Sequence, residues 1–278
     1  MSTAVAAEFR FFSLRVVRTR RLGPSLVRVT FGGEELRDFH SDGRDQSLSL
    51  FLPHPGQDAP AVPVELGDGW WQGWRDLPED VRAVMRSYTL RELRREPDEI
   101  DIDFVLHEPA GPASGWAARA AAGDRVLLIG PAVADNRAIR FRPPADTDLM
   151  VLWGDETAVP AVCAIVESLP AGTRARVWLE VRHSGDIQEP VTEADAEITW
   201  LVRQDHGAEG SPMALDALRG AQLPPAEHPY VWIAGESGCV KALRRHFVGE
   251  RGIDRRRVTF VGYWRRGLTE EQLRELGE

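Results

Sequence analysis

Four consecutive residues, Arg86-Ser87-Tyr88-Thr89, have the most informative chemistry in this chain. An arginine can pair with a phosphate, an aromatic ring can lie along a flat heterocycle, and a hydroxyl can hydrogen-bond its edge. Side chains alternate between faces in a strand, so Arg86 and Tyr88 share a face while Thr89 offers its backbone and hydroxyl at the edge. This order fits a flavin site on a β-barrel, although a Tyr-Thr pair is typical of any strand.

Two further segments with chemical character follow in the chain. Residues 103–107 read DFVLH, an apolar strand, and residues 111–116 read GPASGW, a loop of small residues that enters a helix. Backbone amides at the start of a helix, flanked by residues without bulk, suit a pyrophosphate. The candidate ligand contacts here are Asp103, Phe104, Val105, His107, Gly111, Pro112, Ala113, Ser114 and Trp116.

In order and spacing, these segments resemble the R-x-Y-T-x-R, D-F-V-L-H and G-P-A-S-x-W motifs of the siderophore-interacting proteins. These are flavin-dependent ferric-siderophore reductases of the ferredoxin-reductase-like superfamily. The resemblance implies an N-terminal antiparallel flavin-binding β-barrel followed by a doubly wound parallel-sheet domain for NAD(P)H. It also implies that Arg86 and the loop 111–116 hold the diphosphate of FAD, while Tyr88 and Thr89 set the flavin plane and its N5. An ordinary barrel strand followed by a loop and a helix is the alternative interpretation.

The N-terminal half has the pattern of a barrel or sandwich, because short strands alternate with turn residues. Gly23-Pro24 separates the first two strands, since proline cannot continue a strand. An irregular insertion over residues 55–80 contains Trp70, Trp71 and Trp74, which we expect to cover a barrel end rather than to rim a pocket. The expected strands cover residues 9–20, 25–31, 47–52, 86–91, 99–106 and 125–130.

The pattern changes after residues 142–146, which read RPPAD and form the best domain boundary. Strands and helices then alternate, which is typical of a parallel, doubly wound sheet. We therefore expect an FAD-binding β-barrel domain over 1–143 and an NAD(P)H-binding α/β domain over 144–278. The expected strands lie at 148–153, 175–181, 197–202, 230–234 and 257–262, and the expected helices at 156–168, 211–220 and 236–250.

Three strand ends in the second half are candidate nicotinamide contacts, because such sheets bind ligands at the carboxyl ends of their strands. Residues 154–158 read GDETA, which resembles the family's substitute for a glycine-rich turn, although an acidic helix start also explains it. Arg182 can pair with a 2′-phosphate, which favours NADPH over NADH. The stretch AGE at 234–236 fits the segment that faces nicotinamide in the superfamily, with a plain turn as the alternative. The candidates are Gly154, Asp155, Glu156, Thr157, Ala158, Glu180, Arg182, Ala234, Gly235 and Glu236.

Residues 262–267 read GYWRRG, which resembles another motif of the family, and a short amphipathic helix is expected over 268–278. The resemblance implies that Trp264 lies near the flavin and that the arginines meet an anionic ligand. Family members commonly carry basic residues where this chain has Ser49 and Ala132. A neutral or weakly charged hydroxamate complex is therefore a better expected substrate than an anionic tricatecholate. The expected substrate contacts are Arg44, Ser49, Trp264, Arg265 and Arg266.

Composition narrows the remaining classes of function. The 278 residues contain no apolar run of 18 and begin without a signal-peptide core, so we expect a cytoplasmic protein without membrane insertion. The formal charge of −9 argues against a nucleic-acid partner. Cys163 and Cys239 form no cluster and the histidines show no ligand spacing, so we expect no zinc or iron–sulfur centre. Iron is then expected only on a substrate.

The resemblance implies an FAD-dependent oxidoreductase in which NAD(P)H delivers a hydride to N5 of FAD, and single electrons then pass to Fe(III) in a siderophore. Hard oxygen ligands hold Fe(III) better than Fe(II), so reduction releases the metal. No catalytic acid or base is nominated, because the flavin carries the chemistry. Two alternatives remain open: a general NAD(P)H:flavin or electron-transfer reductase for a separate redox partner, and a non-redox siderophore-binding module. The sequence indicates no oligomeric state.

Overall fold

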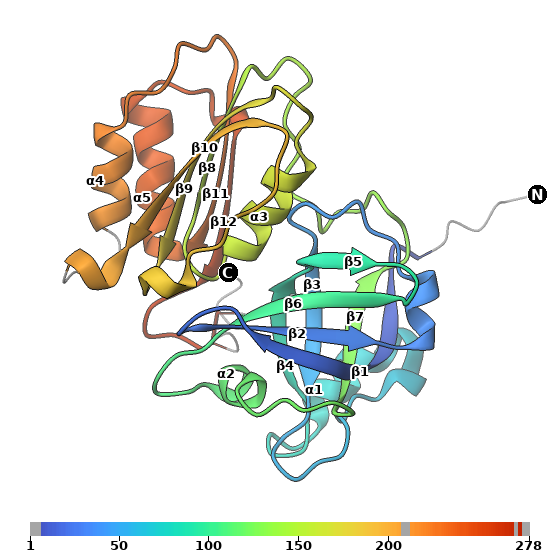
Figure 1. Ribbon diagram of the computed structural model, residues 1–278. Coiled ribbons are helices and arrows are strands. Elements are labelled where there is room, and N and C mark those ends of the chain that lie inside the picture. Colours follow the sequence, from blue (N-terminus) through green and yellow to red (C-terminus); the bar gives the residue numbers. More distant parts are fainter. Residues whose placement is uncertain (1–6, 207–211, 270–271, 274–278) are drawn as a thin grey trace, which may run out of the picture. The chain divides into compact units, whose positions relative to one another are not determined.

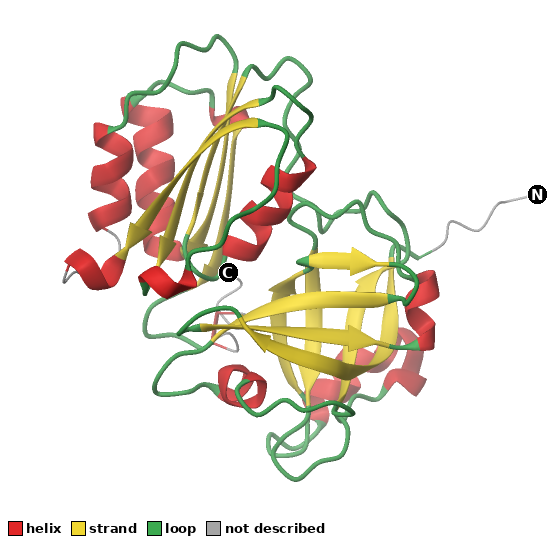
Figure 2. Ribbon diagram, viewed as in Figure 1, coloured by secondary structure: helices red, strands yellow, loops and turns green. Residues whose placement is uncertain are grey.

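The computed structural model describes residues 7–206, 212–269 and 272–273. Strands dominate its N-terminal half, whereas strands alternate with helices in its C-terminal half (Figure 1, Figure 2). Within these described ranges, no helix is both long enough and apolar enough to cross a membrane.

Internal contacts divide the chain into two units. One consists of Met1–Leu22 and Leu26–Ile139, and the other of Gly23–Ser25 and Arg140–Glu278. Each unit contains one sheet, with seven strands in the first and five in the second. The boundary expected from the RPPAD segment, between 143 and 144, lies just after the first unit ends.

The first unit is an antiparallel sheet, which confirms the predicted barrel class. Its strands are β1 (Phe9–Arg21), β2 (Leu26–Gly32), β3 (Ser47–Leu52), β4 (Val84–Thr89), β5 (Glu92–Arg94), β6 (Glu99–Val105) and β7 (Arg125–Pro131). They are ordered β4-β3-β7-β1-β2-β6-β5 in space. All six expected strands are present. β5 was not predicted, because three residues are too few to show an alternating pattern.

Alternation along the strands builds the barrel core. On β6, Ile100, Ile102 and Phe104 are buried in the main apolar cluster of this unit. The Phe104 ring lies 4.4 Å from the ring of Tyr88 on β4, although β4 and β6 stand near opposite ends of the strand order. The sheet must therefore curl until its two ends approach each other, as a barrel requires.

The tryptophan-rich insertion packs on the outer face of this sheet. It forms the short helix α1 (Trp70–Asp76). The Trp70 ring meets the ring of Phe51 edge-on at 5.8 Å, and Trp74 is buried beside it. Trp70 and Trp74 thus cover the outer face of the barrel rather than its end, while residues 55–58 of the same insertion line a cleft described below.

The second unit is a parallel sheet with helices on both faces, which confirms the predicted doubly wound class. Its strands are β8 (Leu149–Gly154), β9 (Arg174–Val181), β10 (Asp195–Val202), β11 (Pro229–Glu236) and β12 (Val258–Trp264), and its helices are α3 (Val159–Ser168), α4 (Pro212–Gly220) and α5 (Ser237–Arg245). The strand order is β10-β9-β8-β11-β12. α3 covers one face, and α4 and α5 cover the other (Figure 1). The direction of winding reverses between β8 and β11, where such sheets bind ligands.

Two helices differ from their predicted extents. The helix expected over 156–168 begins only at Val159, because Asp155–Ala158 form a turn in which the Asp155 carbonyl accepts from the Ala158 amide at 2.8 Å. The helix expected over 236–250 ends as an α-helix at Arg245 and continues as one wider turn, His246–Glu250. The helix expected over 268–278 falls largely outside the described residues, as does residue 211 of the expected helix 211–220.

Candidate functional site

The candidate flavin segment lies on β4, at one end of the barrel's strand order. Arg86 is paired with Leu50 of β3 and Tyr88 with Leu48, so both face the same side of the sheet. Ser87 and Thr89 face the other side, where Thr89 is buried and Ser87 is exposed. The alternation expected from the sequence is therefore present, and the arginine and the tyrosine share a face.

Ring contacts bring the three N-terminal motifs together. Phe104 touches Tyr88 and also lies 5.8 Å from the ring of Trp116, which in turn stacks on Phe31 at 6.2 Å. Trp116 belongs to α2 (Pro112–Ala117), and this helix packs against both β4 and β6. Segments that are well separated in the sequence thus form one aromatic group.

The loop before α2 is held in place by its own polar contacts. The His107 amide donates to Ser114 Oγ at 3.1 Å, and the His107 ring contacts the Pro109 carbonyl at 2.8 Å. Ala113 and Ser114 are buried, and no side chain caps the start of the helix. A Cβ added at Gly111 would lie 3.4 Å from the His107 ring, an ordinary van der Waals contact.

A cleft of about 920 Å³ in the first unit is lined in part by the loop 111–116, whereas Arg86, Tyr88 and Thr89 do not line it. Val84 lines it, together with residues 52–58, several residues of 110–119, and residues 123–125. Trp116, Arg119 and Arg125 are among its lining residues, together with the acidic residues Asp58 and Asp124. A flat aromatic surface beside two cations fits a nucleotide that carries phosphates, so these residues fit FAD. Arg119 and Arg125 were not among the candidates from the sequence, because nothing in their spacing marks them as ligand contacts.

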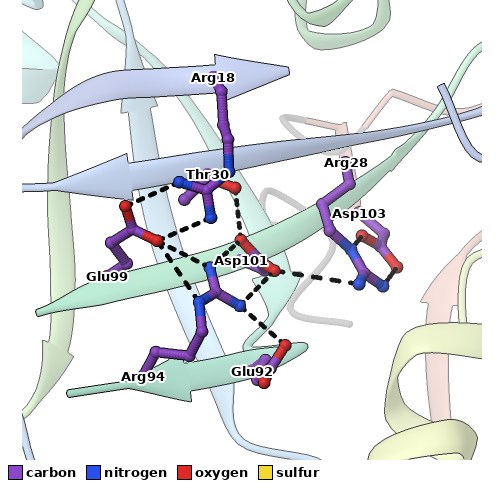
Figure 3. Close-up of polar contacts among 8 residues, drawn as sticks. All are labelled: Arg18, Arg28, Thr30, Glu92, Arg94, Glu99, Asp101 and Asp103. Atoms are coloured by element: carbon purple, nitrogen blue, oxygen red, sulfur yellow. Dashed lines mark hydrogen bonds and ion pairs between the residues drawn. The ribbon is translucent and has the colours of Figure 1, made fainter. Parts of the chain in front are cut away.

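Asp103 does not join this aromatic group. Its side chain lies on the face of β6 opposite to Phe104, and Arg28 donates to both of its carboxylate oxygens, at 2.6 and 2.8 Å. Figure 3 shows that Asp101 and Glu99 follow on the same face, with Arg94 bridging them. This face of the barrel carries a network of ion pairs. A direct contact of the Asp103 side chain with a cofactor therefore remains a prediction.

Two carboxylates on this face, Asp101 and Glu99, are held in their ionised form. Burial pushes the pKa of Asp101 upward, but hydrogen bonds from Arg94 and Thr30 outweigh it and leave that pKa below its ordinary value. For Glu99, the hydrogen bond from Arg18 is the main cause of a lowered pKa. Asp101 and Glu99 are therefore charged at neutral pH.

In the second unit, Asp155 is buried at the end of β8 and accepts four hydrogen bonds. Its Oδ1 accepts from the Thr157 amide at 2.9 Å and from the Thr157 hydroxyl at 2.5 Å. Its Oδ2 accepts from the Glu236 amide at 2.8 Å and from the Trp264 indole at 2.7 Å. Burial and the nearby charge of Glu156 nevertheless raise the pKa of Asp155 to about 7.

The neighbouring Glu156 is not free to repel a phosphate, because Arg203 binds it. Arg203 Nη1 donates to Glu156 at 2.5 Å and to Glu180 at 3.0 Å, and Nη2 donates to the other Glu156 oxygen. Burial raises the pKa of Glu180, and the hydrogen bond from Arg203 opposes that rise. The candidates Glu156 and Glu180 are therefore brought together by a residue that the sequence analysis missed. Arg203 directly follows β10, whose parallel pairing with β9 was the available signal.

The turn after β11 has a special backbone. Gly235 has a φ of +144°, and a Cβ there would lie 2.5 Å from Asp155 Oδ2. Glu236 caps α5 by accepting from the Cys239 amide at 2.8 Å. Ala234 is fully buried.

The expected substrate contacts lie in different surroundings. Ser49 is paired directly with Ser87 across β3 and β4. Arg44 donates to Asp42 at 2.9 Å, and the backbone amide of Arg266 lies 3.4 Å from Glu236 Oε1. Arg182 is exposed after the end of β9. Within residues 7–206, 212–269 and 272–273, no group of three or more His, Cys, Asp or Glu side chains is placed to hold a metal ion.

Comparison with known proteins assigns both units to one family. Residues 15–135 match the model of the siderophore-interacting FAD-binding domain, and residues 147–267 match that of the siderophore-interacting protein. The ferric vibriobactin reductase ViuB of Vibrio cholerae is 33% identical over 94% of this chain and 92% of its own. The NADPH-dependent ferric-chelate reductase of Escherichia coli is 32% identical over 94% and 95%. The crystal structure of the siderophore-interacting protein SipS from Aeromonas hydrophila superposes with a TM-score of 0.74 at 30% identity, over 98% and 99% of the two chains. The chain therefore belongs to the siderophore-interacting protein family.

Proposed function

We propose that this protein is an FAD-dependent oxidoreductase that uses a reduced nicotinamide nucleotide to reduce the Fe(III) of a ferric siderophore. The observation that carries the proposal is the aromatic group of Tyr88, Phe104 and Trp116, of which Trp116 lines the cleft of about 920 Å³. Relatives that align over nearly the full chain are named ferric vibriobactin reductase and ferric-chelate reductase. They support the same class of substrate here.

The barrel residues have the properties needed to hold FAD. We assign Arg86 and the loop 111–116 to its diphosphate, and Tyr88 and Thr89 to the flavin ring and its N5. When bound, FAD accepts a hydride from the nicotinamide and donates single electrons to Fe(III). The hydride carries two electrons, so two Fe(III) are reduced and one proton is released for each nicotinamide oxidised. Iron is substrate in this scheme.

NADPH is the favoured nicotinamide nucleotide. An acidic side chain at the end of the second strand usually binds the ribose hydroxyls of NAD and repels a 2′-phosphate. Here Glu180 is buried and paired with Arg203, whereas Arg182 is exposed two residues later. This arrangement leaves an arginine rather than a carboxylate for the adenosine ribose. The relative from Escherichia coli, whose name includes NADPH, supports the same preference.

A hydroxamate complex is the favoured siderophore. The outer face of β3 and β4 carries the hydroxyl groups of Ser47, Ser49 and Ser87, and Ser49 and Ser87 are a direct cross-strand pair. Neutral hydroxyls offer hydrogen bonds to the carbonyl and hydroxamate oxygens of an uncharged complex. They supply no charge to offset the desolvation of a highly anionic complex. Release of Fe(II) in the cytoplasm is part of the proposal and is tested by fractionating cells that express the tagged protein.

The first test is an absorption spectrum after incubation with FAD and desalting. Retained flavin bands, bleached by NADPH and restored by a ferric trihydroxamate with formation of Fe(II), are the expected result. Restoration by a ferredoxin or a cytochrome but not by the ferric complex would favour the electron-transfer reductase. A protein that stays colourless but binds the ferric complex would favour the non-redox binding module.

A further inference from the structure

One carboxylate joins three strand ends in the second unit. Asp155 follows β8, Glu236 ends β11 and Trp264 ends β12, and these strands are adjacent in the order β8-β11-β12. Their carboxyl ends therefore meet at one edge of the sheet, beside the point where the winding reverses. Asp155 Oδ2 accepts from the Glu236 amide and from the Trp264 indole at this edge.

The site is built to receive this carboxylate. Gly235 provides the space, because a Cβ there would lie 2.5 Å from Asp155 Oδ2, closer than any real contact allows. Thr157 donates twice to Oδ1, so the carboxylate cannot turn without losing a partner. Four donors converge on two oxygens. An asparagine has only one acceptor oxygen and would direct its NH₂ group at two of these donors.

The four hydrogen bonds of the Asp155 carboxylate hold neighbouring protein groups in place. An indole has a single donor, Nε1, and the bond to Asp155 therefore determines how the half-buried Trp264 ring is oriented. The bond to the Glu236 amide likewise holds the Gly235–Glu236 peptide in its unusual conformation. Both groups lie where the sheet is expected to receive a nicotinamide ring.

We infer that Asp155 is the positioning residue of the nicotinamide site: its carboxylate holds the Trp264 ring and the Gly235–Glu236 turn in the arrangement that binds the cofactor. The inference rests on the proposed function and deepens it. It predicts that the hydrogen bonds to Oδ2 matter for cofactor binding and that the hydrogen bonds to Oδ1 matter much less. The two sets of hydrogen bonds can be tested separately, because Thr157 donates only to Oδ1 and Trp264 only to Oδ2.

The test compares three variants of the full chain with the wild type. Asp155→Asn disrupts the carboxylate, Trp264→Phe keeps a ring but removes the Oδ2 donor, and Thr157→Val removes the side-chain donor to Oδ1. NADP⁺ affinity is measured by calorimetry on FAD-free protein. We expect Asp155→Asn and Trp264→Phe each to weaken binding about tenfold, the loss of one hydrogen bond to a charged group, and Thr157→Val to change it less than threefold.

A second readout reports the hydrogen bond between Trp264 and Asp155 directly. The chain has nine tryptophans, and the indole N–H signal of Trp264 in a nitrogen–proton spectrum is the one that Trp264→Phe removes. We expect this signal to shift and to exchange faster with solvent in Asp155→Asn but not in Thr157→Val. An unmoved signal or unchanged NADP⁺ affinity in Asp155→Asn overturns the inference, as does an equal loss of affinity in all three variants. Should Asp155→Asn fail to fold, Trp264→Phe with wild-type affinity overturns it. A wild type that binds neither NADP⁺ nor NADPH refutes the proposed function instead.

Discussion

Trp264 donates its indole N–H to the buried carboxylate of Asp155 at 2.7 Å, across 109 positions of the sequence. The two residues meet because β8 and β12 both run toward the same edge of the sheet and are separated only by β11. The same carboxylate binds the backbone of Glu236, at the end of β11. The G-D-E-T-A turn and the G-Y-W-R-R-G segment, which look like separate motifs in the sequence, are therefore parts of one structure.

The buried carboxyl of Asp155 makes stability depend on pH in a defined direction. Its pKa is raised from 3.8 to about 7 in the folded protein by burial and by Glu156. Between these two values the folded state keeps the proton and the unfolded state loses it, so this group's contribution to stability is lost as pH rises.

The measurement is the free energy of unfolding of wild type minus that of Asp155→Asn, from urea titrations at several pH values. We expect this difference to fall by up to about 1.4 kcal/mol per pH unit between about pH 4 and pH 7, and to level off above pH 7. Titrating groups that do not interact with Asp155 are shared and cancel in the comparison. A difference that rises with pH would show that the four donors outweigh burial.

Removing Arg203 should destabilise the second unit strongly. Arg203→Met leaves the carboxylates of Glu156 and Glu180 buried without a counter-charge, and we expect a loss of about 3 to 5 kcal/mol. The defect should shrink as pH falls, because protonation removes the uncompensated charges. Urea unfolding at pH 5 and pH 8 measures both effects.

Arg219→Met is the matched control for this experiment. Arg219 pairs with Glu250, and both side chains are nearly half exposed, at 48% and 45%. Water already screens this pair, so its removal should change stability much less than Arg203→Met does. Equal losses in the two variants would mean that the Arg203 cluster is no more important than a surface ion pair.

Arg86→Ala should weaken binding of FAD by about ten- to hundredfold, because a charge-assisted contact to the diphosphate is lost. Fluorescence titration with FAD measures the affinity directly. Arg37→Ala removes an exposed arginine elsewhere on the same unit and should leave FAD affinity unchanged. Wild-type affinity in Arg86→Ala would remove this residue from the proposed flavin site.

Ser49→Lys should tighten binding of an anionic ferric tricatecholate about fivefold, because a cation near the surface gains about 1 kcal/mol from an opposite charge. Affinity for a neutral ferric trihydroxamate should stay within twofold of the wild type. Ser49→Met has similar length without charge and serves as the control. Unchanged tricatecholate affinity in Ser49→Lys would show that Ser49 does not face the substrate.

Local patterns in the sequence predicted most of the strands and helices. Two-residue alternation bounded by Gly and Pro predicted the six main barrel strands, and the alternation of strands with helices predicted the parallel sheet. The extent of helix α3 was harder to predict. Thr157 and Ala158 are compatible with a helix, but the hydrogen bonds of Asp155 hold them in a turn until Val159.

The sequence by itself determined which chemical groups this protein possesses, their order and the class of each sheet, because alternation and turn residues act over a few neighbouring positions. Only the tertiary structure decided which groups meet. Arg203 binds Glu156 and Glu180, Asp103 turns toward Arg28 and away from Phe104, and Trp264 reaches Asp155. Each of these contacts depends on strand order and register, which long-range packing selects and which no local pattern contains.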